Sequence, residues 1–259
     1  MSTSPDVNQR TTVHAGEDEA DPREWVDKAR GDGRIVFLGV ELYVAPGTLV
    51  PRHETELLGR TALQALATLR PGADGTLRII DMCCGSGNLA CALAATDPRL
   101  RVLAADLTDD CVALSRKNVA HVGVADRVRI FQGDLFAAFP PHEISGGMDM
   151  IVCNPPYISS GRLTKDRAVL LAREPVQAFD GGPYGISIHQ RVIKDAASVL
   201  RAEGKLLFEI GLGQERQLQR LFDRSGFFSD LSFVADAEGR PRVAMATLNL
   251  VPHHRESNP

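Results

Sequence analysis

The chain has 259 residues, of which 44% are hydrophobic and 24% are charged, and its formal net charge is −4 at pH 7. This balance is typical of one globular α/β domain with a short appendage, and it argues against a broad basic face for nucleic acid. The five cysteines include no C-x-x-C pair, so neither a disulfide framework nor a zinc site is indicated, and a reducing cytoplasm is the expected location. We expect no membrane span and no secretion signal.

Both ends of the chain are polar and nearly lack large hydrophobic residues, so we expect them to form tails without fixed structure. The predicted organisation is a disordered tail over 1–22, a short helix with a β-hairpin over 23–50, one main domain over 51–250, and a flexible tail over 251–259.

Strand and helix patterns alternate through the main domain, which is typical of a mostly parallel sheet with helices on both faces. Apolar periodicity predicts strands at 77–81, 100–106, 127–132, 148–153, 204–210, 227–234 and 242–248, and helices at 54–69, 88–95, 109–122, 186–200 and 214–225. The last two strands form a hairpin that adds one antiparallel strand. The sequence therefore predicts a seven-stranded α/β fold preceded by a small hairpin, 34–44.

The most informative motif is Asn154-Pro155-Pro156-Tyr157, which follows the apolar run 148–153. Two adjacent prolines cannot continue a central strand, because each lacks a backbone N–H. The strand must end at Asn154, at the carboxyl edge where open parallel sheets bind ligands. The Asn154 side-chain oxygen and the Pro155 carbonyl form a rigid pair of acceptors suited to hold an N–H₂ group. A proline-stiffened turn without function is the alternative.

A glycine-rich loop, Cys83-Cys84-Gly85-Ser86-Gly87, follows the predicted strand that ends on Asp81. Glycines allow a tight turn and a close approach of backbone to ligand, and the helix that follows offers free N–H groups to an anion. Residues 85–90 also match the G-x-G-x-x-A fingerprint, so NAD binding is a rival interpretation. We favour S-adenosylmethionine (SAM), because the Asp81 carboxylate would repel a pyrophosphate but attract an ammonium group.

Acidic residues end the next two predicted strands. Asp106, with Leu107 beside it, suits the hydroxyls of a ribose. Asp134 and Leu135 suit the amino group and the ring of a base. Capping of a strand end is the alternative for both aspartates.

In this order, the motifs resemble those of the HemK/PrmC family of SAM-dependent methyltransferases, which modify a glutamine side-chain amide of peptide-chain release factors. The resemblance also rests on these segments: Pro51-Arg52-His53-Glu54-Thr55-Glu56, Glu174-Pro175, Asp180-Gly181-Gly182, Phe208-Glu209-Ile210-Gly211 and Gln214. It covers about residues 35–248 and implies a Rossmann-like class I methyltransferase domain over 51–250. It further implies SAM as cofactor, with S-adenosylhomocysteine as product.

The resemblance assigns residues to two functions. It assigns Cys83, Cys84, Gly85, Ser86, Gly87, Asp106, Leu135 and Asn154 to the cofactor pocket, and our interpretation of the residues adds Asp81, Leu107 and Asp134. It assigns Asn154, Pro155, Pro156 and Tyr157 to the methyl acceptor, with Asn154, Pro155 and Tyr157 as the catalytic residues. Arg52 and Glu54 are further candidates for acceptor binding, because they lie where they could border the acceptor pocket. No metal is implied. Arg52 and Glu54 have an alternative role in capping the helix that starts there.

Two departures from the family pattern affect the expected acceptor. The region before the hairpin is short, and His53 and the Cys83-Cys84 pair replace the residues usual there. The expected acceptor is a protein glutamine or, alternatively, an amine or amide of a small metabolite. Methylation of a nucleic-acid base is less favoured, and a non-catalytic SAM-binding subunit is the remaining alternative. The sequence does not indicate the oligomeric state.

Three further expectations concern the surroundings of the site. Glu209 ends a strand and is either buried beside the site or solvated. His53, His121 and His189 are expected at the surface or on the face of a helix. Residues 159–173 are expected to form a lid, with a surface loop as the alternative.

Overall fold

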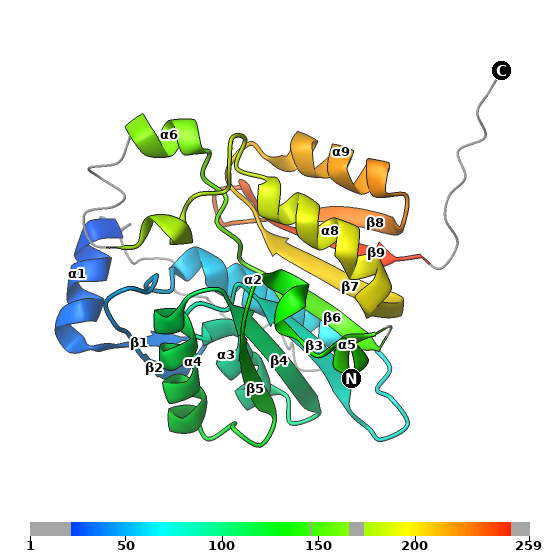
Figure 1. Ribbon diagram of the computed structural model, residues 1–259, viewed down its shortest axis with the longest axis horizontal. Helices are drawn as coiled ribbons and strands as arrows, with labels where there is room; N and C mark the ends of the chain where they lie inside the picture. Colours follow the sequence, from blue (N-terminus) through cyan, green and yellow to red (C-terminus); the bar gives the residue numbers. More distant parts are fainter. Residues whose placement is uncertain (1–21, 146, 166–173, 250–259) are drawn as a thin grey trace, which may run out of the picture.

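The computed structural model describes residues 22–145, 147–165 and 174–249. The predicted tails, apart from Pro22 at the start of a helix, and residues 166–173 of the predicted lid lie outside these ranges. The described residues form a seven-stranded sheet of order β5-β4-β3-β6-β7-β9-β8 with helices on both faces (Figure 1). None of the helices within these residues is long and apolar enough to cross a membrane.

The predicted strand topology is confirmed. The central strands β3 to β7 run parallel, β9 pairs antiparallel with β7, and β8 pairs antiparallel with β9 at the edge. Their bounds are β3 (Leu77–Met82), β4 (Leu100–Asp106), β5 (Val128–Gln132), β6 (Met148–Cys153), β7 (Leu200–Glu209), β8 (Phe228–Ala235) and β9 (Pro241–Leu248).

Two apolar cores form because neighbouring strand residues point to opposite faces. Ile79 packs into one core and Ile80 into the other. The first core is covered by α2 (His53–Leu66), α3 (Asn88–Thr96) and α4 (Asp109–Val122). The second is covered by η1 (Leu135–Ala138), α5 (Pro141–Ile144), α8 (Ser187–Val199) and α9 (Glu215–Ser225).

Short elements account for most differences from prediction. The helices η1, α5, α6 (Ser160–Lys165) and η2 (Val176–Ala178) were not predicted, because segments of this length cannot show a helical period. Strand β7 begins at Leu200 instead of 204. Leu200 pairs with Met148, the register then shifts, and Lys205 pairs with Met150.

The N-terminal segment forms α1 (Pro22–Asp32) and the predicted hairpin of β1 (Arg34–Phe37) and β2 (Val40–Tyr43). One buried side chain fixes the hairpin to the main domain. Asn118 of α4 accepts from Tyr43 N through Oδ1 at 2.8 Å, and its Nδ2 donates to Tyr43 O at 3.1 Å and to Ser86 O at 2.9 Å. Asn118 therefore joins the hairpin to the glycine-rich loop.

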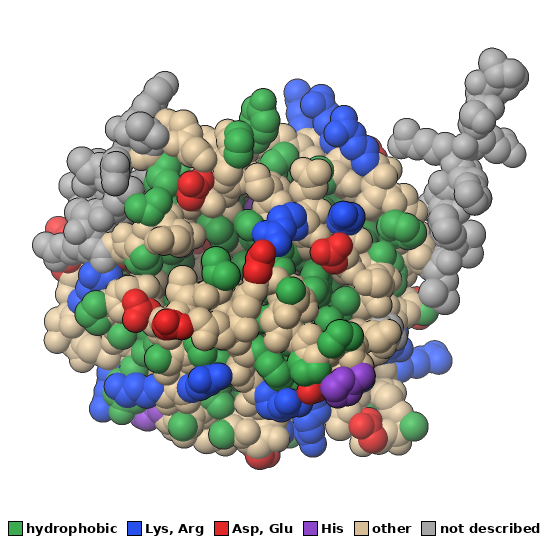
Figure 2. Space-filling view, in the orientation of Figure 1, with side chains coloured by type: hydrophobic (Ala, Val, Ile, Leu, Met, Phe, Trp, Pro, Cys, Tyr) green, Lys and Arg blue, Asp and Glu red, His purple; other side chains and the backbone are tan. Residues whose placement is uncertain are grey.

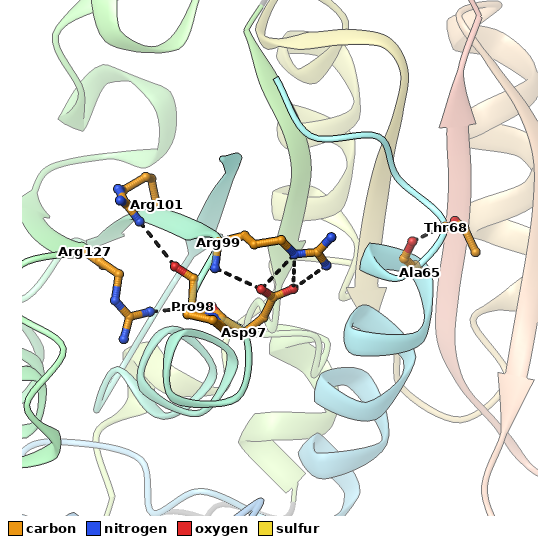
Figure 3. Close-up of polar contacts among 7 residues, drawn as sticks. All are labelled: Ala65, Thr68, Asp97, Pro98, Arg99, Arg101 and Arg127. Carbon is orange, nitrogen blue, oxygen red and sulfur yellow. Dashed lines mark hydrogen bonds and ion pairs between the residues drawn. The ribbon is translucent and has the colours of Figure 1, made fainter. Parts of the chain in front are cut away.

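The amino end of β4 carries polar contacts of a structural kind, shown in Figure 3. Asp97 accepts from the backbone N of Arg99 at 2.9 Å and pairs with the Arg99 guanidinium. Arg127 donates to Asp97 O at 3.5 Å. These contacts close the turn between α3 and β4, at the edge of the sheet opposite to the one where β3 and β6 end.

We predict that Asn118→Ala lowers the free energy of unfolding by about 2–4 kcal/mol, because three hydrogen bonds of about 1 kcal/mol each are lost and backbone groups stay buried without partners. Urea denaturation measures the change. Arg116→Ala, on the exposed side of α4, is the control and should cost less than about 1 kcal/mol. An equal loss in the two variants would show that Asn118 does not anchor the hairpin.

Candidate functional site

The predicted motifs meet at the carboxyl ends of β3, β4 and β6. The chain runs from β3 outward to β4 and β5, and returns to β6 on the other side of β3. Met82, the last residue of β3, lies opposite Ala105 of β4 and Cys153 of β6. The glycine-rich loop and Asn154 therefore emerge side by side, at the switch point of strand order where such sheets bind ligands.

The glycine-rich loop is wound tightly at this point. Cys83, Gly85 and Gly87 all have positive φ angles, of 59°, 54° and 75°, and glycine adopts these most easily. A Cβ on Gly87 would press on Ser115, whereas a Cβ on Gly85 would meet no atom within 4 Å. The Gly85 backbone therefore borders open space, as a close approach to a ligand requires.

Asp81 is buried below this loop. Its Oδ2 accepts from the Ala90 backbone N at 2.9 Å in the first turn of α3, and its Oδ1 has no hydrogen-bond partner among the described residues. Burial, with a smaller contribution from the Asp106 charge, raises the pKa of Asp81 to about 7. A buried carboxyl oxygen without a partner is a place for a cationic or hydrogen-bond-donating group.

The predicted ribose and base contacts are arranged differently from each other. Asp106 accepts from Gly85 N at 2.9 Å and from Thr108 N at 3.2 Å, so it shapes the glycine-rich loop. Leu107 is 60% exposed beside it. Asp134 pairs with Arg191 of α8 at 2.7 Å and stays exposed, whereas Leu135 is buried.

The loop after β6 is held by three different elements. The Asn154 amide Nδ2 donates to the Thr55 hydroxyl of α2 at 3.1 Å. The Tyr157 hydroxyl donates to Glu209 Oε1 of β7 at 3.1 Å, and Arg242 Nη2 of β9 donates to the Tyr157 oxygen at 3.4 Å. These contacts fix both ends of the Asn154–Tyr157 loop.

The Tyr157 backbone is fixed as well. Gln214 Nε2 donates to Tyr157 O at 2.9 Å and to Gly185 O at 3.0 Å, and its Oε1 accepts from Gly211 N at 2.8 Å. One amide therefore ties three loops together. Gly185, with φ 72°, passes so close that an added Cβ would collide with the Tyr157 carbonyl oxygen.

Glu209 is buried beside the loop, which was one of the two predicted alternatives. Burial raises the pKa of its carboxyl group, and the nearby Thr55 hydroxyl, Arg242 and Tyr157 act in the opposite direction. Burial, reinforced by the Glu209 charge, also raises the pKa of Tyr157, so the phenol stays protonated and can donate.

Of the two expectations for His189, the surface position is wrong, and the position on a helix face is right, since it lies in α8. This residue is fully buried, and its Nε2 lies 3.1 Å from the backbone oxygen of Glu209. Burial lowers the pKa of His189 to about 4, so the ring is neutral at pH 7 and donates to that oxygen. His189 therefore links α8 to β7 through a hydrogen bond to the β7 backbone.

The two predicted acceptor-binding residues at the start of α2 lie in different surroundings. Arg52 forms an ion pair with Glu174, which also accepts from Val50 N at 2.9 Å. Glu54 instead lines a cavity of about 290 Å³ between the start of α2 and the β8–β9 turn. Arg242, which donates to the Tyr157 oxygen, lines the same cavity.

Sequence reasoning missed two residues that hold the site. Thr55 was part of a quoted motif but was given no role, although its place three residues after Arg52 put it beside predicted acceptor contacts. Arg242 carried no signal except its position at the start of an apolar strand. No group of three or more potential metal ligands occurs in the part of the chain that the structure describes.

Two glycine variants test how closely Gly185 and Tyr157 are packed. Gly213 has a similar φ of 81°, but a Cβ there would meet nothing within 4 Å. Gly213→Ala should lower the free energy of unfolding by about 1–2 kcal/mol, from the backbone conformation alone. Gly185→Ala should cost about 1–3 kcal/mol more, from the collision. Equal losses in urea denaturation would contradict the close approach.

Comparisons with known proteins show the family of this chain. A family model described as "Methyltransferase small domain" matches residues 61–182. The release factor glutamine methyltransferase of Geobacter sulfurreducens is 32% identical over 82% of this chain and 69% of that protein. The 4-amino-L-phenylalanine/4-methylamino-L-phenylalanine methyltransferase of Streptomyces pristinaespiralis is 35% identical over 86% of this chain and 72% of that protein.

Solved structures share the fold. The ribosomal protein L11 methylase from Lactobacillus delbrueckii subsp. bulgaricus matches with a TM-score of 0.54 and 19% identity, over 80% of this chain and 84% of that one. The expected enzyme class, a methyltransferase, is confirmed. The chain belongs to the release factor glutamine methyltransferase family, the HemK/PrmC family that its motifs indicate.

Proposed function

We propose that this methyltransferase uses SAM to methylate a glutamine side-chain amide of a protein, with a release factor as the first acceptor to test. The observation that carries the proposal is the fixed loop at Asn154. Its amide nitrogen is bound to Thr55, which directs the amide oxygen away from that contact. The family relationship supports the same acceptor chemistry.

The proposed cofactor site lies at the glycine-rich loop. The Asp81 carboxyl has an oxygen without a partner to receive the ammonium of SAM, and the Gly85 backbone faces open space. Asp106 would hold the ribose, with Leu107 and Leu135 beside the base. Asp134 would have to share its carboxylate with Arg191. When bound, SAM supplies an electrophilic methyl group on a positively charged sulfur.

The chain's own residues orient the nucleophile. An amide nitrogen is a weak nucleophile, since its lone pair is delocalised. Asn154 Oδ1 and the Pro155 carbonyl would accept its two N–H bonds and so fix the direction of the lone pair. Such positioning supplies up to about 7–11 kcal/mol of a barrier in favourable cases. The same two oxygens stabilise positive charge that develops on nitrogen.

No strong general base is needed in this arrangement, because the proton can leave to water after transfer. The proposal gives Glu209 no role as a base; its Oε1 accepts from Tyr157, and its buried Oε2 has no partner among the described residues. The Tyr157 ring would wall the planar acceptor group. Asn154, Pro155 and Tyr157 therefore keep their predicted catalytic roles in the proposal, with Pro156 fixing the loop.

A second candidate acceptor is the aromatic amine of a free amino acid. The relative from Streptomyces pristinaespiralis acts, by its name, on 4-amino-L-phenylalanine. The cavity between the start of α2 and the β8–β9 turn carries the carboxylates of Glu54 and Asp236 and the guanidiniums of Arg60 and Arg242 on its walls. Opposite charges of this kind suit the ammonium and carboxylate of an amino acid, which a glutamine within a protein lacks.

A nucleic-acid acceptor is less favoured. On the face shown in Figure 2, basic side chains are interspersed with acidic and hydrophobic ones instead of forming one basic surface.

The five cysteines are free thiols, which supports the cytoplasm as the proposed location. A non-catalytic SAM-binding subunit, the remaining alternative from the sequence, is disfavoured by the intact Asn154–Tyr157 loop.

The test is incubation with methyl-labelled SAM and three acceptors: a release-factor preparation, a protein-free metabolite extract, and 4-amino-L-phenylalanine. Label on a release-factor glutamine, located by mass spectrometry, supports the proposal. Label on small molecules alone overturns the protein acceptor and supports the second candidate. Transfer to none of them overturns both.

Two alanine variants separate acceptor contacts from cofactor contacts. Asn154→Ala should lower turnover by about a thousandfold or more, by analogy with removal of one oxyanion donor, while SAM affinity changes little. Asp106→Ala should weaken SAM binding by about tenfold or more, because a charged hydrogen-bond partner is lost. Calorimetric SAM titration and single-turnover kinetics measure the two effects. Equal loss of SAM affinity in the two variants would contradict this division.

SAM affinity should depend on the ionisation of Asp81. Burial raises the pKa of Asp81 to about 7, and a bound ammonium favours the ionised carboxylate, so binding releases a proton. Affinity should therefore rise by about tenfold from about pH 6 to about pH 8. Asp81→Asn should bind SAM more weakly and without this pH dependence. A flat profile for the unaltered protein would contradict the proposed role.

A further inference from the structure

Helix α9 carries a row of arginines along its outer side. Arg216, Arg220 and Arg224, here called the arginine stripe, follow one another at intervals of four residues and are exposed. Leu218 and Phe222 are buried on the opposite side of the helix. Basic side chains lie in a row over α9 in Figure 2, at the place that α9 has in Figure 1. At 1.5 Å per residue, the stripe is about 12 Å long.

The arginine stripe has no acidic partner within the residues that the structure describes. None of its guanidinium groups forms an ion pair or a hydrogen bond with them. Asp223 of the same helix accepts from Gln219 instead, at 3.0 Å. Other exposed arginines are paired, such as Arg34 with Glu41 in the hairpin. The charge of the stripe is therefore available to a partner.

Local energetics disfavour this arrangement. Like charges four residues apart on a helix repel each other, and the arginine stripe contains two such pairs in succession. Arg216 also lies in the first turn of α9, where the positive end of the helix dipole opposes a cation. No ion pair with the described residues offsets these costs. The charges therefore do not stabilise α9, which favours a role in binding.

The arginine stripe begins next to the proposed acceptor loop and leads away from it. Gln214, the residue before α9, donates to Tyr157 O at 2.9 Å. Arg216 follows two residues later in the chain. A macromolecule whose reacting group entered the Asn154–Tyr157 loop could thus extend over α9, whereas a small acceptor would not reach along the helix.

Apolar side chains near the start of the stripe favour a protein as the partner. Tyr184 is 75% exposed and Leu212 is 54% exposed. Gln214 joins their two loops, because it donates to Gly185 O and accepts from Gly211 N. Protein interfaces combine aromatic and apolar groups with arginine, whereas a phosphate backbone offers no apolar contact to a leucine. Unpaired arginines beside such groups match an acidic protein surface by charge.

We infer that the arginine stripe is a docking surface for an acidic face of the protein that carries the acceptor glutamine. The inference rests on the proposed function, from which it takes the identity of the partner. It gives the chain a way to bind a protein acceptor outside the reacting loop, through contacts that a free amino acid cannot make.

Three variants test the docking surface. The glutamate variant carries Arg216→Glu, Arg220→Glu and Arg224→Glu together, and the lysine variant carries lysine at the same three positions. The control variant reverses the charge of three exposed arginines elsewhere: Arg70→Glu, Arg101→Glu and Arg116→Glu. The glutamate and control variants change the net charge equally, so an effect of overall charge on association appears in both.

The first readout is the binding of a purified release factor in the presence of S-adenosylhomocysteine, measured by biolayer interferometry. At about 50 mM salt, we expect Kd to rise about tenfold or more in the glutamate variant. The difference should shrink at about 300 mM salt, because exposed charges are then screened. The control and lysine variants should stay within about threefold of the unaltered protein.

The second readout is methyl transfer to the release factor. KM should rise with Kd in the glutamate variant, while kcat and SAM affinity stay unchanged, because the arginine stripe lies outside the reacting loop. An unchanged Kd in the glutamate variant, or an equal rise in the control variant, would overturn the inference. So would a mixed tRNA preparation that binds more tightly than the release factor and is lost in the glutamate variant, since the partner would then be a nucleic acid.

Failure of the proposed function gives a different result. If the release factor binds but takes no label, the acceptor chemistry is wrong, and Kd of the glutamate variant still decides whether the stripe binds that protein. If the release factor takes label and the glutamate variant keeps its Kd and KM, the docking role is wrong while the proposed function stands. A release factor that neither binds nor takes label overturns both.

Discussion

The end of β6 at two adjacent prolines is the constraint on which the site depends. Because Pro155 and Pro156 cannot extend the ladder, Asn154 is left at the carboxyl edge of the central strand, next to the glycine-rich loop after β3. The two prolines alone do not fix the orientation of the Asn154–Tyr157 loop on the rest of the domain. Contacts from α2, β7, β9 and Gln214 hold its two ends, so a short motif is fixed by distant parts of the chain.

The two halves of the site use different physics. The proposed cofactor half relies on backbone wound through positive φ angles and on one buried carboxyl, Asp81, whose second oxygen has no partner among the described residues. The proposed acceptor half relies on side-chain hydrogen bonds around a second buried carboxyl, Glu209. Burial disfavours the charged form of both carboxyl groups. Asp81 has a free oxygen for the proposed ligand, and Glu209 accepts a hydrogen bond from Tyr157 of the acceptor loop.

The features that could be predicted from the sequence are local ones. The strands β3 to β6, the glycine-rich loop and the Asn154–Tyr157 motif follow from apolar runs, glycines and prolines over short spans. The contacts that orient the site join residues far apart, such as Arg52 with Glu174, separated by 122 residues, and Arg242 with Tyr157, separated by 85. His189 misled because a polar residue in an amphipathic helix indicates surface, whereas here the packing of α8 on β7 gives it a backbone partner.

In the proposed mechanism, Asn154 Oδ1 and the Pro155 carbonyl hold the nitrogen that is methylated. A crystal structure with S-adenosylhomocysteine and a glutamine-containing acceptor peptide, or 4-amino-L-phenylalanine, tests it most directly. We expect the acceptor nitrogen within about 3 Å of both oxygens, with Nδ2 of Asn154 still on Thr55. An acceptor nitrogen bound elsewhere, or an Asn154 amide turned to present Nδ2 to it, would show that these oxygens do not hold it.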